Sequence, residues 1–199
     1  MNDKSTDHQG LYTLASGQAG YFTSAQAHDY GFSTERLSYH AQTGRFQRVQ
    51  RGLYRFRDFP STADEEVVAA WVKIGRDDAF VSHATALMWH GLSDLIVDEV
   101  DITVPREARY LKSIPGVRIH TTTTTQAQGE LQHLRGVQVS APVRAIVEST
   151  AARVIPDQIE QAVFDLLDRR ITTSDELLKS AKSHGLRTYN QIKQVVEAY

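Results

Sequence analysis

The sequence lacks cysteine altogether, which excludes disulfide frameworks, cysteine nucleophiles and thiolate zinc sites. It also lacks a long apolar run, because the longest, residues 67–72, is far short of the roughly 20 residues that cross a bilayer. The first ten residues are polar and have no apolar core of the kind that a signal peptide needs. We therefore expect a soluble cytoplasmic protein with no membrane partner.

A large excess of charge of either sign is absent as well, since the 199 residues carry a net charge of −2. Positive charge is nevertheless concentrated in residues 33–57, where six arginines and a single acid, Glu35, give +5 and leave −7 for the remainder. Such an asymmetry favours an oriented approach to a polyanion, with the acidic remainder turned away. The alternative is that these arginines only solvate a small hairpin and discourage pairing at its edge.

Short elements fill the N-terminal part of the chain. Leucine and alanine at helical spacing predict a helix over residues 11–15, and residues 20–23 have an extended pattern. The T-x-x-Q sequence that begins at Thr23 is a capping box, which predicts a second helix ending near Gly31. A further helix is expected only a few residues later, so two helices are joined by a tight, glycine-containing turn, as in a helix-turn-helix.

Ser33 is the predicted N-cap of that further helix, and Gly44 ends it. Residues 45–50 and 53–56 then have strand patterns on either side of Gly52, which predicts a β-hairpin. Helix, helix, helix and hairpin in that order form a winged helix-turn-helix, so we expect this fold at the N-terminus.

The composition changes near Pro60, where longer amphipathic patterns with acidic residues begin, and we place a boundary there between domains 1–60 and 61–199. Capping boxes at Thr62 and Thr173 each predict a helix start. Further helices are expected over 83–92, over 142–151 with proline in the first turn, and as two or three helices from Pro156 onward. Strands are expected near 79–81 and at 100–105, 116–121 and 136–140. The predicted fold class is α+β: an N-terminal winged helix-turn-helix domain followed by an α+β domain with a helical C-terminal tail.

The helix after Ser33 presents a polar face. If Leu37 and Ala41 point inward, the 100° step per residue leaves Arg36 on the flank and sends four residues outward, with lengths that suit base edges in a major groove: Glu35, Ser38, Tyr39 and Gln42. The hairpin arginines are better placed for phosphates or the minor groove. The predicted DNA-binding residues are Ser33, Thr34, Arg36, Ser38, Tyr39, Gln42, Arg45, Arg48, Arg51 and Arg55.

Three segments carry a family resemblance. Residues 20–56 are similar to an N-terminal winged helix whose wing reads "RGxYR", and residues 77–94 are similar to an "SHxSAxxxxGL" segment, carried by Ser82, His83, Ala86, Gly91 and Leu92. Residues 136–149 are similar to "GxxVTxxxRTxxD", with Val139, Pro142 and Arg144 retained but Ser140, Ala145 and Glu148 replacing Thr, Thr and Asp. On these segments the chain resembles the AbiEi-type antitoxins of type IV toxin–antitoxin (abortive infection) systems.

The resemblance implies a two-domain antitoxin that binds inverted repeats in double-stranded DNA near its own promoter and represses its operon. Its C-terminal domain is then the part that opposes a nucleotidyltransferase-like toxin encoded next to it. The alternative is a stand-alone winged-helix transcription regulator whose second domain binds a small ligand or another protein.

A third possibility is a DNA-modifying enzyme, but the sequence favours no catalysis, no cofactor and no metal. A divalent-ion nuclease needs clustered carboxylates and a lysine on adjacent strands, whereas residues after 150 have amphipathic helical patterns. His83 and His90 are seven residues apart on one helix, about 10 Å along its axis, too far to share a metal ion. His120 and His133 form no ligand spacing with them, and the threonine run from residue 121 to 125 is expected to be a strand end running into a loop.

Two features of the second domain are expected to be structural. Neighbouring side chains on a helix diverge, so Ser82 and His83 do not form a nucleophile arrangement, and His83 is expected to be a buried, hydrogen-bonded histidine beside a helix cap. Arg144 and Glu148 stand at i and i+4 and are expected to pair within one helix, with contact to a partner as the alternative.

Overall fold

The structure is a computed structural model that describes residues 6–75, 77–94, 98–111, 113–123 and 129–199. The chain divides into two compact units, and each is described by itself. The first unit comprises Met1–Ala79 with Leu134–Val137, and the second comprises Phe80–His133 with Gln138–Tyr199.

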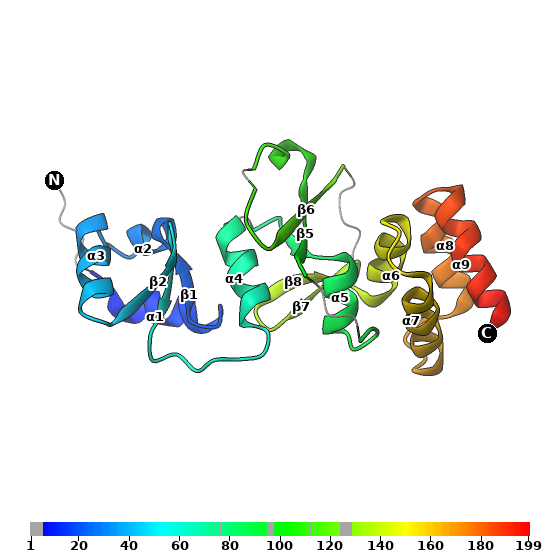
Figure 1. The fold of residues 1–199 in the computed structure, drawn as a ribbon, viewed down its shortest axis with the longest axis horizontal. Coiled ribbons are helices and arrows are strands. Elements are labelled where there is room, and N and C mark those ends of the chain that lie inside the picture. The colour runs from blue at the N-terminus through cyan, green and yellow to red at the C-terminus, as the bar shows by residue number, and fades with distance from the viewer. Residues whose placement is uncertain (1–5, 76, 95–97, 112, 124–128) are drawn as a thin grey trace. The chain divides into compact units, whose positions relative to one another are not determined.

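The first unit begins with three helices and a small antiparallel sheet (Figure 1). Its elements are α1 (His8–Ser16), β1 (Tyr21–Thr23), α2 (Ser24–Asp29), α3 (Thr34–Gln42), β2 (Phe46–Gln50) and β3 (Leu53–Phe56). The strands pair in the order β1-β3-β2, so β3 is the central strand and β2 lies at an edge. These elements are the predicted ones, and their order is that of the predicted winged helix-turn-helix.

Local signals in the sequence set the helix starts. The Thr23 hydroxyl accepts a hydrogen bond from the Gln26 backbone N–H at 3.1 Å, and the Gln26 side-chain oxygen accepts one from the Thr23 N–H at 2.8 Å. These two bonds complete the predicted capping box at the start of α2. Ser33 caps α3 by accepting from the Arg36 N–H at 3.2 Å. Gly52, in the turn between β2 and β3, has φ of 76°, a left-handed conformation that glycine adopts without a steric cost.

Aromatic side chains form the core under α3. Phe22, Phe32 and Phe46 are each at most 1% exposed, and the ring of Phe46 lies 5.0 Å from that of Phe22 and 5.8 Å from that of Phe32, between centroids. Leu37 of α3 belongs to the same buried cluster. Because Phe46 opens β2 and Leu37 lies at the middle of α3, this packing fixes the helix against the hairpin.

The first unit extends past the predicted boundary at residue 60 because α4 (Glu65–Ile74) packs against β1 and β3. The capping box predicted at Thr62 is wrong. The helix begins two residues later, with Asp64 as a cap residue whose side chain makes no capping bond. The Asp64 carboxylate is paired with Arg135 instead.

The second unit contains a five-stranded mixed sheet. Its strands are β4 (Phe80–Val81), β5 (Val100–Pro105), β6 (Val117–Thr122), β7 (Leu131–Leu134) and β8 (Val137–Ser140), in the order β6-β5-β4-β8-β7. Strand β5 runs antiparallel to β4 and parallel to β6, and β8 runs parallel to β4. Four of these strands were predicted. Thr121 and Thr122 end β6 and Thr123 follows it, as expected, while Thr124 and Thr125 lie outside the described residues.

Helices complete the second unit (Figure 1). They are α5 (His83–Trp89), the 3₁₀ turn η1 (Arg106–Ala108), α6 (Pro142–Ala151), α7 (Pro156–Asp168), α8 (Ser174–Ser183) and α9 (Leu186–Ala198). Prolines stand in the first turn of α6 and α7, and the predicted capping box at Thr173 starts α8. The predicted α+β class with a helical tail is therefore confirmed. Among the described residues, no helix combines the length and the apolar character needed to cross a membrane.

Candidate nucleic-acid interface

The outer face of α3 is polar and exposed, as the sequence predicted. Leu37 is 1% exposed and Ala41 packs against the core, so the opposite face of α3 points away from the core. Tyr39 is 62% exposed although it is a large aromatic residue. The exposed residues of this face and of its N-terminal turn are Ser33, Thr34, Glu35, Arg36, Ser38, Tyr39 and Gln42, of which Glu35 is acidic.

The hairpin carries exposed arginines beside α3. Arg45, Arg48 and Arg51 are all exposed, and so is Arg57 directly after β3. Strand β2 is at the edge of the sheet, and its ladder is irregular between Arg48 and Gln50. An edge strand with a bulge has few neighbours to cover its side chains, which explains why three consecutive residues, 47–49, are exposed.

Arg55 does not belong to this surface, and its prediction as a DNA-binding residue is corrected. It is 6% exposed, and its Nη2 donates to the Pro60 carbonyl at 3.0 Å and to Glu65 Oε2 at 3.1 Å. The guanidinium also lies 5.5 Å from the ring centroid of Tyr21. The physical reason is its place on β3, the central strand, against which α4 packs. Strand position, which depends on the whole sheet, was not visible in the local pattern.

The electrostatics of the remaining residues favour an anionic partner. Arg36 contacts the Thr6 hydroxyl and the Gly31 carbonyl, both of which are neutral, so its charge is not cancelled by them. Burial and the nearby Arg45 and Arg36 keep the pKa of His8 below its ordinary value, and burial does the same to His40. Both histidines are therefore neutral near pH 7, and the positive charge of this surface comes from its arginines.

The second unit contains a separate polar cluster around α5 and α6. The predicted pair is present: Arg144 Nε donates to Glu148 Oε1 at 2.7 Å, and both side chains are 8% exposed. Ser140 donates to the other oxygen of Glu148 at 2.7 Å, and Arg144 Nη1 donates to Glu130 at 2.8 Å. The pair is thus part of a buried network that ties α6 to the end of β8.

The sequence did not predict that His83 and His120 meet. Their rings stack with centroids 3.6 Å apart and planes 15° apart. His83 Nδ1 lies 2.9 Å from the Ser82 hydroxyl, and His120 Nε2 lies 2.8 Å from Asp101 Oδ1. The expected hydrogen bond beside a helix cap is confirmed for His83, but its partner is Ser82, so the prediction that these two neighbouring side chains diverge was wrong. The reason is local: Ser82 is the extended N-cap residue of α5 and His83 has φ of 52°, so the pair does not have regular helical geometry.

Burial and, after it, the neighbouring His120 lower the pKa of His83 from 6.5 to about 4. Within the described part of the chain, no group of three or more histidine, aspartate or glutamate side chains is arranged to hold a metal ion.

The sequence model of a family described as "Transcriptional regulator, AbiEi antitoxin" matches residues 10–57, the segment that holds α3 and the hairpin. No curated protein matches the chain. The crystal structure of the RV2827C protein from Mycobacterium tuberculosis has a similar fold, with a TM-score of 0.59 and 12% identity over 98% of this chain and 79% of that one. Residues 10–57 therefore match the AbiEi antitoxin family of transcriptional regulators, and the resemblance seen in the sequence is confirmed over that segment.

Proposed function

We propose that this protein binds double-stranded DNA of its own promoter through α3 and the β2–β3 hairpin, and represses transcription from it in the cytoplasm. The observation that carries the proposal is the exposed polar face of α3 beside the exposed arginines of the hairpin, inside the segment that matches the regulator family. The rest of the chain sums to −7, and the DNA phosphates would repel it. This repulsion favours binding with residues 33–57 toward the duplex.

In the proposed complex, α3 enters the major groove and the hairpin lies along the backbone. Tyr39 and Gln42 have hydrogen-bonding groups on exposed side chains of α3, and a glutamine amide can pair with adenine at N6 and N7. Arg45, Arg48 and Arg51 contact phosphates, which supplies affinity rather than sequence choice. Repression then follows from occupation of the promoter.

The test is a double substitution, Arg48→Ala with Arg51→Ala, in the full chain. If about five phosphates are contacted, the wild-type plot of log K against log salt has a slope near −4 to −5, and the loss of two contacts makes it about 2 less steep. The control is Lys179→Ala with Lys182→Ala, which removes the same charge from exposed positions of α8. Fluorescence anisotropy at four salt concentrations measures both slopes. An unchanged slope in the arginine variant contradicts the proposal.

We further propose that the second unit opposes a nucleotidyltransferase-like toxin, as the family resemblance implies. The support is that the antitoxin family matches the N-terminal segment, while the polar segments of the resemblance, around Ser82 and Arg144, lie in the second unit. Co-expression with the product of an adjacent nucleotidyltransferase gene tests this, because only an antitoxin restores growth. Absence of such a gene favours a stand-alone regulator, and plasmid cleavage in the presence of magnesium would favour an enzyme.

A further inference from the structure

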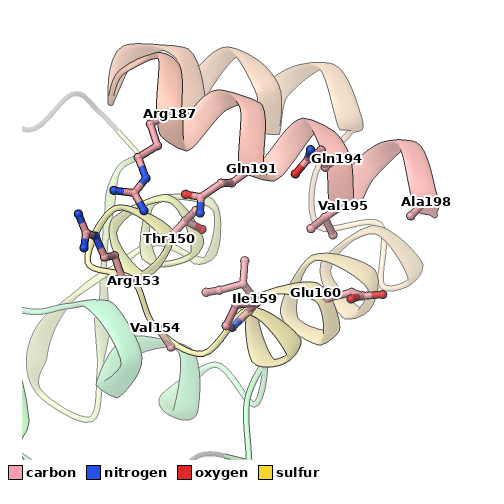
Figure 2. A pocket seen from close by; sticks show the side chains of 11 residues that line it. Thr150, Arg153, Val154, Ile159, Glu160, Arg187, Gln191, Gln194, Val195 and Ala198 are labelled. Carbon is pink, nitrogen blue, oxygen red and sulfur yellow. The ribbon is translucent and has the colours of Figure 1, made fainter.

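The helical tail of the second unit contains a pocket of about 540 Å³ that the proposed DNA interface does not use. Its walls come from the end of α6, the segment that follows it, α7 and α9 (Figure 2). The volume lies within the range of about 300–1,000 Å³ that is typical of sites for small molecules.

One end of the pocket is cationic and rich in hydrogen-bond donors. Figure 2 shows Arg153 and Arg187 at the same end, with Gln191 and Thr150 between them and the rest of the pocket. Both arginines are exposed, and among the described residues neither forms an ion pair. Arg187 also stands in the first turn of the 13-residue helix α9, where the helix dipole adds partial positive charge. Two guanidinium groups and a helix start favour a carboxylate or a similar anionic group.

The remainder of the pocket is apolar. Ile159, which is 5% exposed, faces Val195 across the pocket, and Val154 and Ala198 also line it (Figure 2). The acidic Glu160 lies toward the end far from the arginines in the same view. A ligand that fits this lining has its charge at one end and a hydrocarbon body along the other part.

Arg153, which lines the pocket, stands in an unusual turn. It has φ of 63°, and it follows α6 at the position where a left-handed residue ends a helix. The Val154 N–H donates to the Ser149 carbonyl, and the Arg153 N–H donates to the Thr150 carbonyl, both at 3.1 Å, which together form a Schellman motif. Glycine is the usual residue at this position, so an arginine there opposes the local conformational preference.

We propose that this pocket binds a small amphiphilic anion, with its carboxylate between Arg153 and Arg187 and its aliphatic chain against Ile159 and Val195. The proposal goes beyond DNA binding and concerns the second unit alone. It assigns Arg153 a ligand-binding role because Arg153 lines the cationic end of the pocket together with Arg187.

The test uses decanoate as the probe and the full-length protein, with binding measured by isothermal titration calorimetry. Decanoate is expected to bind about tenfold tighter than octanoate, because each additional buried CH₂ contributes about fourfold in affinity at most. Arg153→Gly is expected to weaken decanoate binding about tenfold through loss of a charge-assisted contact. The melting temperature of this variant should equal or exceed that of the wild type, because glycine suits the left-handed turn.

Arg170→Gly is the matched control. Arg170 is also exposed, has φ of 53°, and ends α7 in the same kind of turn, but it does not line the pocket. Unchanged decanoate binding in Arg170→Gly, together with the loss in Arg153→Gly, supports the proposal. It is overturned if decanoate does not bind, if the two variants behave alike, or if decylammonium binds as tightly as decanoate.

Discussion

Arg55 Nη2 lies 3.1 Å from Glu65 Oε2, in an ion pair whose side chains are 8% and 27% exposed. The pair joins the central strand β3 to α4. Arg55 therefore has a structural role, although it lies in a strongly basic segment of the sequence. Arginines that are close in sequence thus have different roles. Arg51, before β3, and Arg57, directly after it, are exposed, whereas Arg55 within the strand is buried.

Arg55→Ala is expected to lower the free energy of unfolding by about 2–3 kcal/mol, because it leaves the partly buried Glu65 without its partner. Arg57→Ala, which removes an exposed arginine two residues away, should change stability by less than about 0.5 kcal/mol. Urea unfolding followed by circular dichroism compares the two. Equal stability of the two variants would mean that the Arg55 pair does not hold α4 in place.

Sequence choice on DNA should depend on α3 rather than on the hairpin. Gln42→Ala is expected to weaken binding to the operator by about 1–3 kcal/mol while leaving binding to unrelated DNA unchanged, because an amide contact to a base edge is sequence-dependent. Tyr39→Phe should behave likewise if the Tyr39 hydroxyl contacts a base. Competition between operator and scrambled duplexes at fixed salt measures the ratio of affinities. If both duplexes lose affinity equally, α3 contacts only the backbone.

Much of the first unit could be predicted because its signals are local. The capping box at Thr23, the cap at Ser33 and the turn at Gly52 each act within a few residues, and each is present in the structure. The exposed face of α3 followed from helical periodicity once Leu37 was assigned to the core. The mistaken capping box at Thr62 shows the limit of such signals, since α4 begins after Asp64, whose carboxylate pairs with the distant Arg135 and does not cap the helix.

The features that could not be predicted depend on strand order. Strand β7 has only two leucines in four residues, too few for a clear alternating pattern. The burial of Arg55 and the stacking of His83 on His120 both arise from which strands are neighbours, and a single sequence does not specify that. Contacts between residues far apart in sequence were therefore the main source of error at the candidate sites.

The buried network on α6 should contribute strongly to stability. Glu148→Ala is expected to lower the free energy of unfolding by about 2–3 kcal/mol, because Arg144 would lose one carboxylate partner and keep the partly exposed Glu130, and Ser140 would lose its acceptor. The control is Asp165→Ala, which breaks the i, i+4 pair of Arg169 and Asp165, whose side chains are 47% and 28% exposed. That change should cost less than about 1 kcal/mol. Similar costs in urea unfolding would indicate that the Glu148 network is not fully formed.

Acid should destabilise the protein through His83. Its pKa is about 4 in the folded protein, below the ordinary 6.5, because burial and the adjacent His120 disfavour the charged ring; Arg144 acts in the same direction, while Glu148 and Asp101 oppose it. The unfolded chain therefore binds a proton at a higher pH than the folded one does. The contribution to stability is intact above pH 6.5 and is lost as the pH falls toward 4, by an amount on the order of 2–3 kcal/mol.

His83→Asn is the variant that isolates this effect, because asparagine tolerates the left-handed conformation of this position, φ of 52°, and does not titrate. The free energy of unfolding of the wild type should fall between pH 6.5 and pH 4 more steeply than that of the variant, since the variant lacks the proton that the unfolded wild type takes up. Urea titrations at half-unit pH steps measure the difference in slope. Parallel curves for the two proteins would contradict this prediction. They would show that His83 has the same pKa in the folded and unfolded wild type, so that burial and stacking on His120 do not lower it.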